Sequence, residues 1–144
     1  MKVEDFLVGI EPGVYILKPA WIDETAQTRN GDPMISVQWE VVKGPYAGAT
    51  VWDNLPKTQA AAFKWAQLYI AFGGSPQDEV ESFEDLTKRV IDAANTGSTV
   101  YAKVVRETYQ GRARARIGEY LPQDIGVKLI EAQNRAEPPS DVPF

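Results

Sequence analysis

The chain has 144 residues, which suits one domain of ordinary size. Hydrophobic residues make up 44% of the sequence and charged residues 24%, which excludes wholesale disorder and a fibrous repeat. Neither Cys nor His is present, so thiol nucleophiles, disulfides, Cys/His zinc sites and Ser-His-Asp catalysis are excluded. No apolar run has membrane-spanning length and the start has no signal-peptide pattern, so we expect a cytoplasmic protein with no membrane partner.

The first third of the chain has the pattern of three β-strands. Residues 12–23 are rich in β-branched and aromatic types and lead into a turn at Asn30-Gly31. Residues 34–44 alternate between apolar and polar, as in a half-buried strand. The apolar positions of this second strand are Ile35, Val37, Trp39 and Val41. Residues 49–55 predict a third, shorter strand, which Pro56 ends.

The hydrophobic period then changes to that of α-helices. Residues 58–74 are Ala-rich, with apolar positions three and four apart, and Gly73-Gly74 end this predicted helix. Ser82, with Asp85 three residues later, resembles a capping box. It predicts a second helix with one apolar stripe, ending near residues 95–97.

A hairpin is predicted next, from residues 98–110 and 111–121. Three strands, a helical segment and two strands is the chain order of an OB-fold, a five-stranded Greek-key barrel with helices between its third and fourth strands. We therefore predict a mainly β protein, with an OB-fold nucleic-acid-binding domain over residues 1–122. Residues 123–144 contain only a short amphipathic piece near 127–131 before a Pro-rich end, so they predict a linker and a flexible C-terminal tail.

Charge is distributed unevenly along the chain. The net charge is -5, yet residues 98–117 hold five cations against Glu107 alone. These cations are Lys103, Arg106, Arg112, Arg114 and Arg116. Residues 75–95 hold six acidic side chains against two basic ones. A concentrated basic element on an acidic body is typical of a localised anion-binding surface.

The spacing of three arginines favours nucleic acid as the anion. Arg112, Arg114 and Arg116 alternate with small apolar residues, so on a strand they share one face at a repeat of roughly 6.6 to 6.8 Å. That repeat is close to the phosphate spacing of an extended strand. Tyr101 and Lys103 have the parity to face outward on the neighbouring strand, and aromatic rings between cations suit sequence-tolerant single-strand binding. The alternative is a solvated face whose charges prevent edge-to-edge aggregation.

The other aromatic residues divide by the same parity argument. Trp39 shares the face of the apolar residues of its strand, and Trp65 lies on the apolar stripe of the predicted helix. Both are therefore predicted to be core residues. Trp52 faces away from Val51 and Leu55, which makes it a candidate for stacking on bases. Further candidates for nucleic-acid binding, next to predicted loops and turns, are Trp21, Tyr46, Tyr109, Lys43 and Arg29.

The end of the chain carries a resemblance. The final four residues are Asp141, Val142, Pro143 and Phe144. They resemble the C-terminal tip of bacterial single-stranded DNA-binding proteins, an acidic run followed by an apolar residue, Pro and Phe. In that family the Phe ring enters an apolar pocket of a replication or repair protein and the terminal carboxylate meets a basic residue. The resemblance assigns partner binding to these four residues, although only one Asp precedes Val142 here.

A second resemblance covers residues 10–122. The stretches PGVYILK, QWEVVKGPYAGATVWDNL and YAKVVRETYQGRARARIGEYLP are similar to those of small phage proteins with an OB-type core, thought to bind single-stranded DNA during phage replication. Both resemblances imply a non-enzymatic protein, without cofactor, that coats and protects single-stranded DNA in phage replication or recombination. They also imply recruitment of replication or recombination proteins through the tip, a place in the host cytoplasm and possible homo-oligomers.

Two other functions are compatible with the sequence. One is an adaptor module whose exposed aromatic residues and Pro-Phe end bind another protein without contacting DNA. The other is a magnesium-dependent nuclease that uses carboxylates such as Asp23 and Asp53. Because scattered single acids are more often solubilising or capping groups, we expect no catalytic residue and no metal site.

Overall fold

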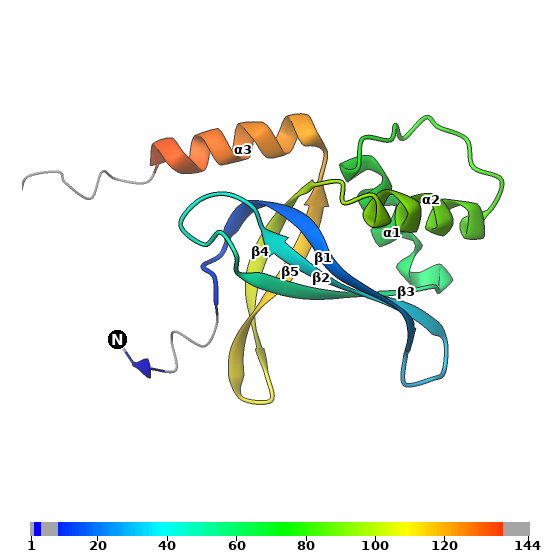
Figure 1. Ribbon diagram of the computed structural model, residues 1–144, viewed down its shortest axis with the longest axis horizontal. Coiled ribbons are helices and arrows are strands. Elements are labelled where there is room, and N and C mark those ends of the chain that lie inside the picture. Colours follow the sequence, from blue (N-terminus) through cyan, green and yellow to red (C-terminus); the bar gives the residue numbers. More distant parts are fainter. Residues whose placement is uncertain (1, 4–8, 137–144) are drawn as a thin grey trace, which may run out of the picture.

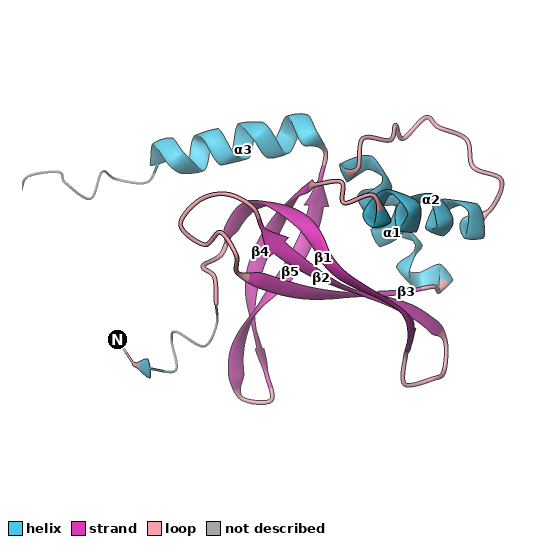
Figure 2. Ribbon diagram, in the orientation of Figure 1, coloured by secondary structure: helices cyan, strands magenta, loops and turns pink. Residues whose placement is uncertain are grey.

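The computed structural model describes residues 2–3 and 9–136. The protein is mainly β: five antiparallel strands form one open sheet in the order β3-β2-β1-β4-β5, accompanied by three α-helices (Figures 1 and 2). The strands are β1 (Gly13–Gln27), β2 (Pro33–Val41), β3 (Thr50–Pro56), β4 (Val100–Tyr109) and β5 (Arg112–Leu121). The helices are the 3-10 turn η2 (Gln59–Ala61), α1 (Ala62–Ala71), α2 (Phe83–Asn95) and α3 (Gln123–Ala136).

Strand β1 is long enough to pair with two different neighbours. Its residues 13–17 pair with β4, and residues 17–27 pair with β2. An irregularity between Pro19 and Trp21, followed by a second one further along, interrupts the pairing with β2, and such bulges bend a strand. Pro19 is tolerated because it lies beyond the last β1 residue that pairs with β4, so its missing N–H leaves no gap on that side.

The core lies where the alternation of β2 predicts it. Ile35, Val37, Trp39 and Val41 are each at most 2% exposed, which confirms the predicted inner face of this strand. Trp65 of α1 is fully buried as well, and its indole N–H donates to the Pro56 carbonyl at 2.8 Å. Both tryptophans predicted to belong to the core are therefore core residues.

The predicted helices and the hairpin turn are confirmed. After α1, Gly73 has a φ of 106°, a left-handed conformation that favours glycine. Ser82 caps α2, because its Oγ accepts a hydrogen bond from the Asp85 N–H at 3.1 Å. Gln110 and Gly111 have φ values of 51° and 77°, the left-handed pair that a tight two-residue hairpin turn requires.

Side chains join β3 and β5, the two edges of the open sheet. Tyr120 of β5 donates a hydrogen bond to Asp53 of β3 at 2.5 Å and accepts one from the Trp39 indole N–H at 3.0 Å. Lys64 of α1 forms an ion pair with Asp53 at 2.6 Å. Burial and the Asp53 charge raise the pKa of Tyr120 well above its ordinary value, so its hydroxyl stays a neutral donor. Burial also raises the pKa of Asp53, and Lys64 and Tyr120 oppose that rise.

Helix α3 is the main departure from the sequence-based prediction. The linker predicted from residue 123 is wrong for residues 123–136, which form a 14-residue helix. Gly126 of α3 lies so close to Tyr101 of β4 that a Cβ atom would overlap the Tyr101 ring. The Gln133 side chain accepts from the Val14 N–H at 2.9 Å and donates to the Val14 carbonyl at 3.4 Å. These bonds satisfy the Val14 N–H and carbonyl in the part of β1 that does not pair with β2. The predicted tail, residues 137–144, lies outside the described residues.

The Tyr120 hydroxyl is expected to be important for stability. Replacing Tyr120 with Phe leaves a buried carboxylate and a buried indole N–H each short of one partner. We expect the free energy of unfolding to fall by about 2 to 4 kcal/mol, measured by urea denaturation with circular dichroism. Tyr109→Phe, on an exposed tyrosine, is the control and should change it by less than about 0.5 kcal/mol. A loss below about 1 kcal/mol for Tyr120→Phe would contradict this role.

The contact between Gly126 and Tyr101 predicts that α3 tolerates no side chain there. Gly126→Val should push α3 away from β4, lower the free energy of unfolding by about 1 to 3 kcal/mol and speed tryptic cleavage after Lys128. Ala132→Val places the same residue at an exposed position of the same helix and serves as the control. Equal effects of the two substitutions on stability and cleavage would show that the contact does not hold α3.

Candidate nucleic-acid interface

Two exposed tryptophans meet on the outer face of β1, β2 and β3. Trp21 of β1 and Trp52 of β3 are both partners of Gln38 on the intervening strand β2. Trp21 is 57% and Trp52 46% exposed. Their ring centroids are 5.5 Å apart and the rings meet edge to face at 83°. This tryptophan pair offers flat apolar surfaces on which planar rings can stack.

Polar side chains border the tryptophan pair. In the next row of the sheet, Ser36 donates a hydrogen bond to the Asn54 side-chain carbonyl at 2.7 Å. In the row on the other side, Lys18 forms an ion pair with Glu40 at 3.6 Å. Together with Gln38, these groups can hydrogen-bond to the edges of a stacked base. Gln38 and Asn54 are not among the residues predicted for the site, although their alternation with core residues of β2 and β3 indicates that they face outward.

The three arginines of β5 share one exposed face, as their alternation predicts. We call Arg112, Arg114 and Arg116 the arginine ladder. The Arg114 guanidinium carbon lies 4.0 Å from the centre of the Tyr109 ring, and Tyr109 is exposed at the end of β4. Arg114 and Arg116 form ion pairs with Glu107 at 2.6 and 3.0 Å. Within the described part of the chain, the Arg112 side chain forms no hydrogen bond or ion pair, so its guanidinium group is available to a ligand.

The remaining cations of the hairpin divide between its two faces. Lys103 is exposed on the face of the arginine ladder, across from Glu119. Arg106 alternates with Glu107, so it lies on the opposite face, and there it forms an ion pair with Glu11 at 3.3 Å. Arg106 is therefore not part of the ladder surface. Its parity along the strand indicates this, but its partner Glu11, which precedes β1, could not be found from the sequence.

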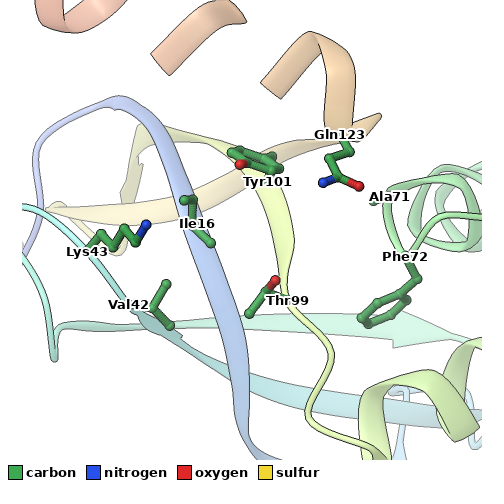
Figure 3. Close-up of a pocket in the computed structure, with 8 residues that line it drawn as sticks. All are labelled: Ile16, Val42, Lys43, Ala71, Phe72, Thr99, Tyr101 and Gln123. Carbon is green, nitrogen blue, oxygen red and sulfur yellow. The ribbon is translucent and has the colours of Figure 1, made fainter. Parts of the chain in front are cut away.

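Tyr101 and Lys43 come from distant parts of the sequence and line one hollow of about 330 Å³. Figure 3 shows the Lys43 amine and the Tyr101 hydroxyl turned toward each other across Ile16, with Phe72 and Gln123 at the far side. Tyr101 has the outward parity that was predicted, but α3 packs on its ring. Tyr101 is therefore half-buried beside α3, and its role in stacking stays a prediction.

The remaining residues predicted for nucleic-acid binding are scattered over the structure. Tyr46 is partly buried and packs edge-on against Tyr15, with ring centroids 6.1 Å apart, so it supports the core more than it presents a platform. Arg29 is exposed in the loop between β1 and β2. A second hollow, of about 310 Å³, lies beside Trp21 and is bordered by Asn95 at the end of α2. The tip, residues 141–144, lies outside the described residues.

The two carboxylates considered as metal ligands have other partners. Asp53 is occupied by Tyr120 and Lys64. Asp23 accepts hydrogen bonds from the Thr25 hydroxyl at 2.7 Å and the Thr25 N–H at 2.9 Å, which hold its pKa below the ordinary value. Residues 2–3 and 9–136 contain no group of three or more Asp or Glu placed to hold a metal ion. Over the same residues, no helix combines the length and the apolar character that crossing a membrane requires.

Comparison with known proteins adds no assignment. Neither models of protein families nor the curated proteins give a match to this chain. The geometry itself offers an aromatic pair with polar neighbours on β1, β2 and β3, and a cationic face with one aromatic ring on the β4–β5 hairpin. This combination can bind a ligand that has both flat rings and negative charges.

The exposure of the four tryptophans predicts a simple fluorescence result. Trp39 and Trp65 are fully buried, whereas Trp21 and Trp52 face solvent. In the double variant Trp21→Phe/Trp52→Phe, we expect the acrylamide-accessible fraction of the emission to fall to near zero and the remaining emission to shift to shorter wavelength. Emission as quenchable as that of the wild type would contradict this placement of the tryptophans.

Proposed function

We propose that the protein binds and protects single-stranded DNA without strong sequence preference and has no catalytic activity or cofactor. The observation that carries the proposal is the tryptophan pair: two large rings, exposed and in contact, with hydrogen-bonding side chains beside them. Bases would stack on Trp21 and Trp52, since every base has a flat face that an indole can cover. Exposing these apolar rings to water is unfavourable for the free energy of the free protein, so their exposure is better explained by ligand binding.

The strand order supports an OB-type barrel as the scaffold. Strands β3-β2-β1-β4-β5, with α1 and α2 between β3 and β4 in the chain, follow the order of that fold. In our proposal the barrel closes between β3 and β5, where Tyr120 and Asp53 join the two strands. An OB-fold binds oligonucleotides across its strands 2 and 3, which here present Gln38 and Trp52. The β1–β2 and β4–β5 hairpins project to the same side of the molecule, away from α3, and would flank the bound strand (Figure 1).

Phosphates would bind the arginine ladder. Arg112 is available, and the repeat along β5 suits successive phosphates of an extended strand. The net charge of -5 would weaken non-specific attraction to nucleic acid elsewhere on the surface. We further propose, on the sequence resemblance of the tip, that residues 141–144 recruit replication or recombination proteins during phage DNA metabolism.

The tryptophan pair gives the test. Fluorescence anisotropy of labelled oligo(dT) should show binding that weakens with salt, with a log-log slope of roughly -0.7 per phosphate neutralised. Trp21→Ala and Trp52→Ala should each weaken binding about 5- to 100-fold, because stacking on one aromatic ring is worth about 1 to 3 kcal/mol. Phe63→Ala, which removes a 66% exposed ring from α1, is the matched control and should leave the affinity unchanged.

Two results would overturn the proposal. One is the absence of binding to oligo(dT) at low salt, which would favour the adaptor function. The other is an equal loss of affinity for oligo(dT) in Phe63→Ala and in the tryptophan variants. That result would show that any exposed aromatic ring contributes to binding, wherever it lies on the surface.

A further inference from the structure

Glu107 is the side chain that neutralises the arginine ladder. It lies on β4 directly across from Arg114, and the register of the hairpin places Arg116 diagonally beside it. One carboxylate oxygen accepts the Arg114 Nε–H at 2.6 Å, and the other lies 3.0 Å from the Arg116 Nε. A single carboxylate thus bridges two successive arginines of the ladder, as two oxygens of a phosphate could.

Both arginines are tied to this carboxylate, although their side chains remain about half exposed. The Glu107 side chain is 28% exposed, against 52% for Arg114 and 47% for Arg116, so Glu107 is the most buried of the three side chains. Arg114 also covers the Tyr109 ring, and the Arg116 Nη1 donates to the Ile117 carbonyl at 3.1 Å. The free protein therefore presents a ladder whose second and third arginines are already engaged, and only Arg112 is open.

We infer that Glu107 is an internal counter-ion that the DNA backbone displaces, and that it sets the affinity threshold of the ladder. This inference rests on the proposed function. A first phosphate binds Arg112, and the next phosphates of the same strand then compete with Glu107 for Arg114 and Arg116. A polyanion can make this exchange because its phosphates are tethered to one another, whereas a single small anion cannot. The ladder thereby discriminates against isolated anions.

The substitution Glu107→Gln tests the inference, because Gln keeps the shape of the side chain and removes its charge. Affinity for oligo(dT) at low salt should rise about 3- to 10-fold, as expected when one or two exposed ion pairs no longer compete. The gain should shrink as the salt concentration rises. Glu119→Gln is the matched control: it removes the same charge from the same face of the hairpin, across from Lys103 and away from the ladder, and should change the affinity less than twofold.

A second measurement tests the contact itself without DNA. In NMR spectra of the free protein, the Nε–H signals of Arg114 and Arg116 should be protected from solvent exchange, and the protection should fall in Glu107→Gln. Unprotected signals in the wild type, or an affinity that does not rise in Glu107→Gln, would overturn the inference while leaving DNA binding intact. An equal rise for Glu119→Gln would also overturn it, since net charge would then suffice. If neither the wild type nor Glu107→Gln binds oligo(dT), the proposed function itself fails.

Discussion

The hydrogen bond between Tyr120 and Asp53 is a buried contact between β5 and β3, the two edges of the sheet. In the described part of the chain, β3 and β5 share no backbone pairing, and this buried contact, with Trp39 on one side and Lys64 on the other, links their side chains. It also explains why an acidic residue is tolerated next to the core, since its desolvation is offset by a neutral donor and an ammonium group. Trp52 precedes Asp53 on β3, so the alternation of the strand turns its ring outward, where it meets Trp21.

The candidate interface has two chemically different parts. The tryptophan pair with its polar neighbours suits bases, and the arginine ladder suits phosphates. Neither part alone would define a nucleic acid as the ligand, because exposed rings also bind proteins and surface arginines are common. Their presence on one small sheet, in a protein whose overall charge is negative, is what favours single-stranded DNA. In our proposal Glu107 adds a constraint, since it engages Arg114 and Arg116 until a tethered series of phosphates displaces it.

Much of the fold follows from local patterns, and the exceptions have a physical reason. The alternation of β2, the Ser82 cap and the Gln110-Gly111 turn are properties of neighbouring residues, so the sequence predicts them. Helix α3 was not predictable in that way: Gly126 disfavours a helix locally, and it is required because Tyr101, far away in the chain, occupies the space of a side chain. The same holds for the site. The parity of Trp52 was predictable, but its contact with Trp21 and the role of Glu107 depend on strand register.

The most direct test of the account is to locate bound DNA on the surface. An oligonucleotide carrying 5-iodouracil can be crosslinked to the full chain by light, and the modified residues identified by mass spectrometry. The account predicts crosslinks at Trp21 and Trp52, with Tyr109 as a further site, and none at Phe63 or Tyr69. Crosslinks confined to the helices, or a pattern unchanged by excess unlabelled oligo(dT), would contradict it.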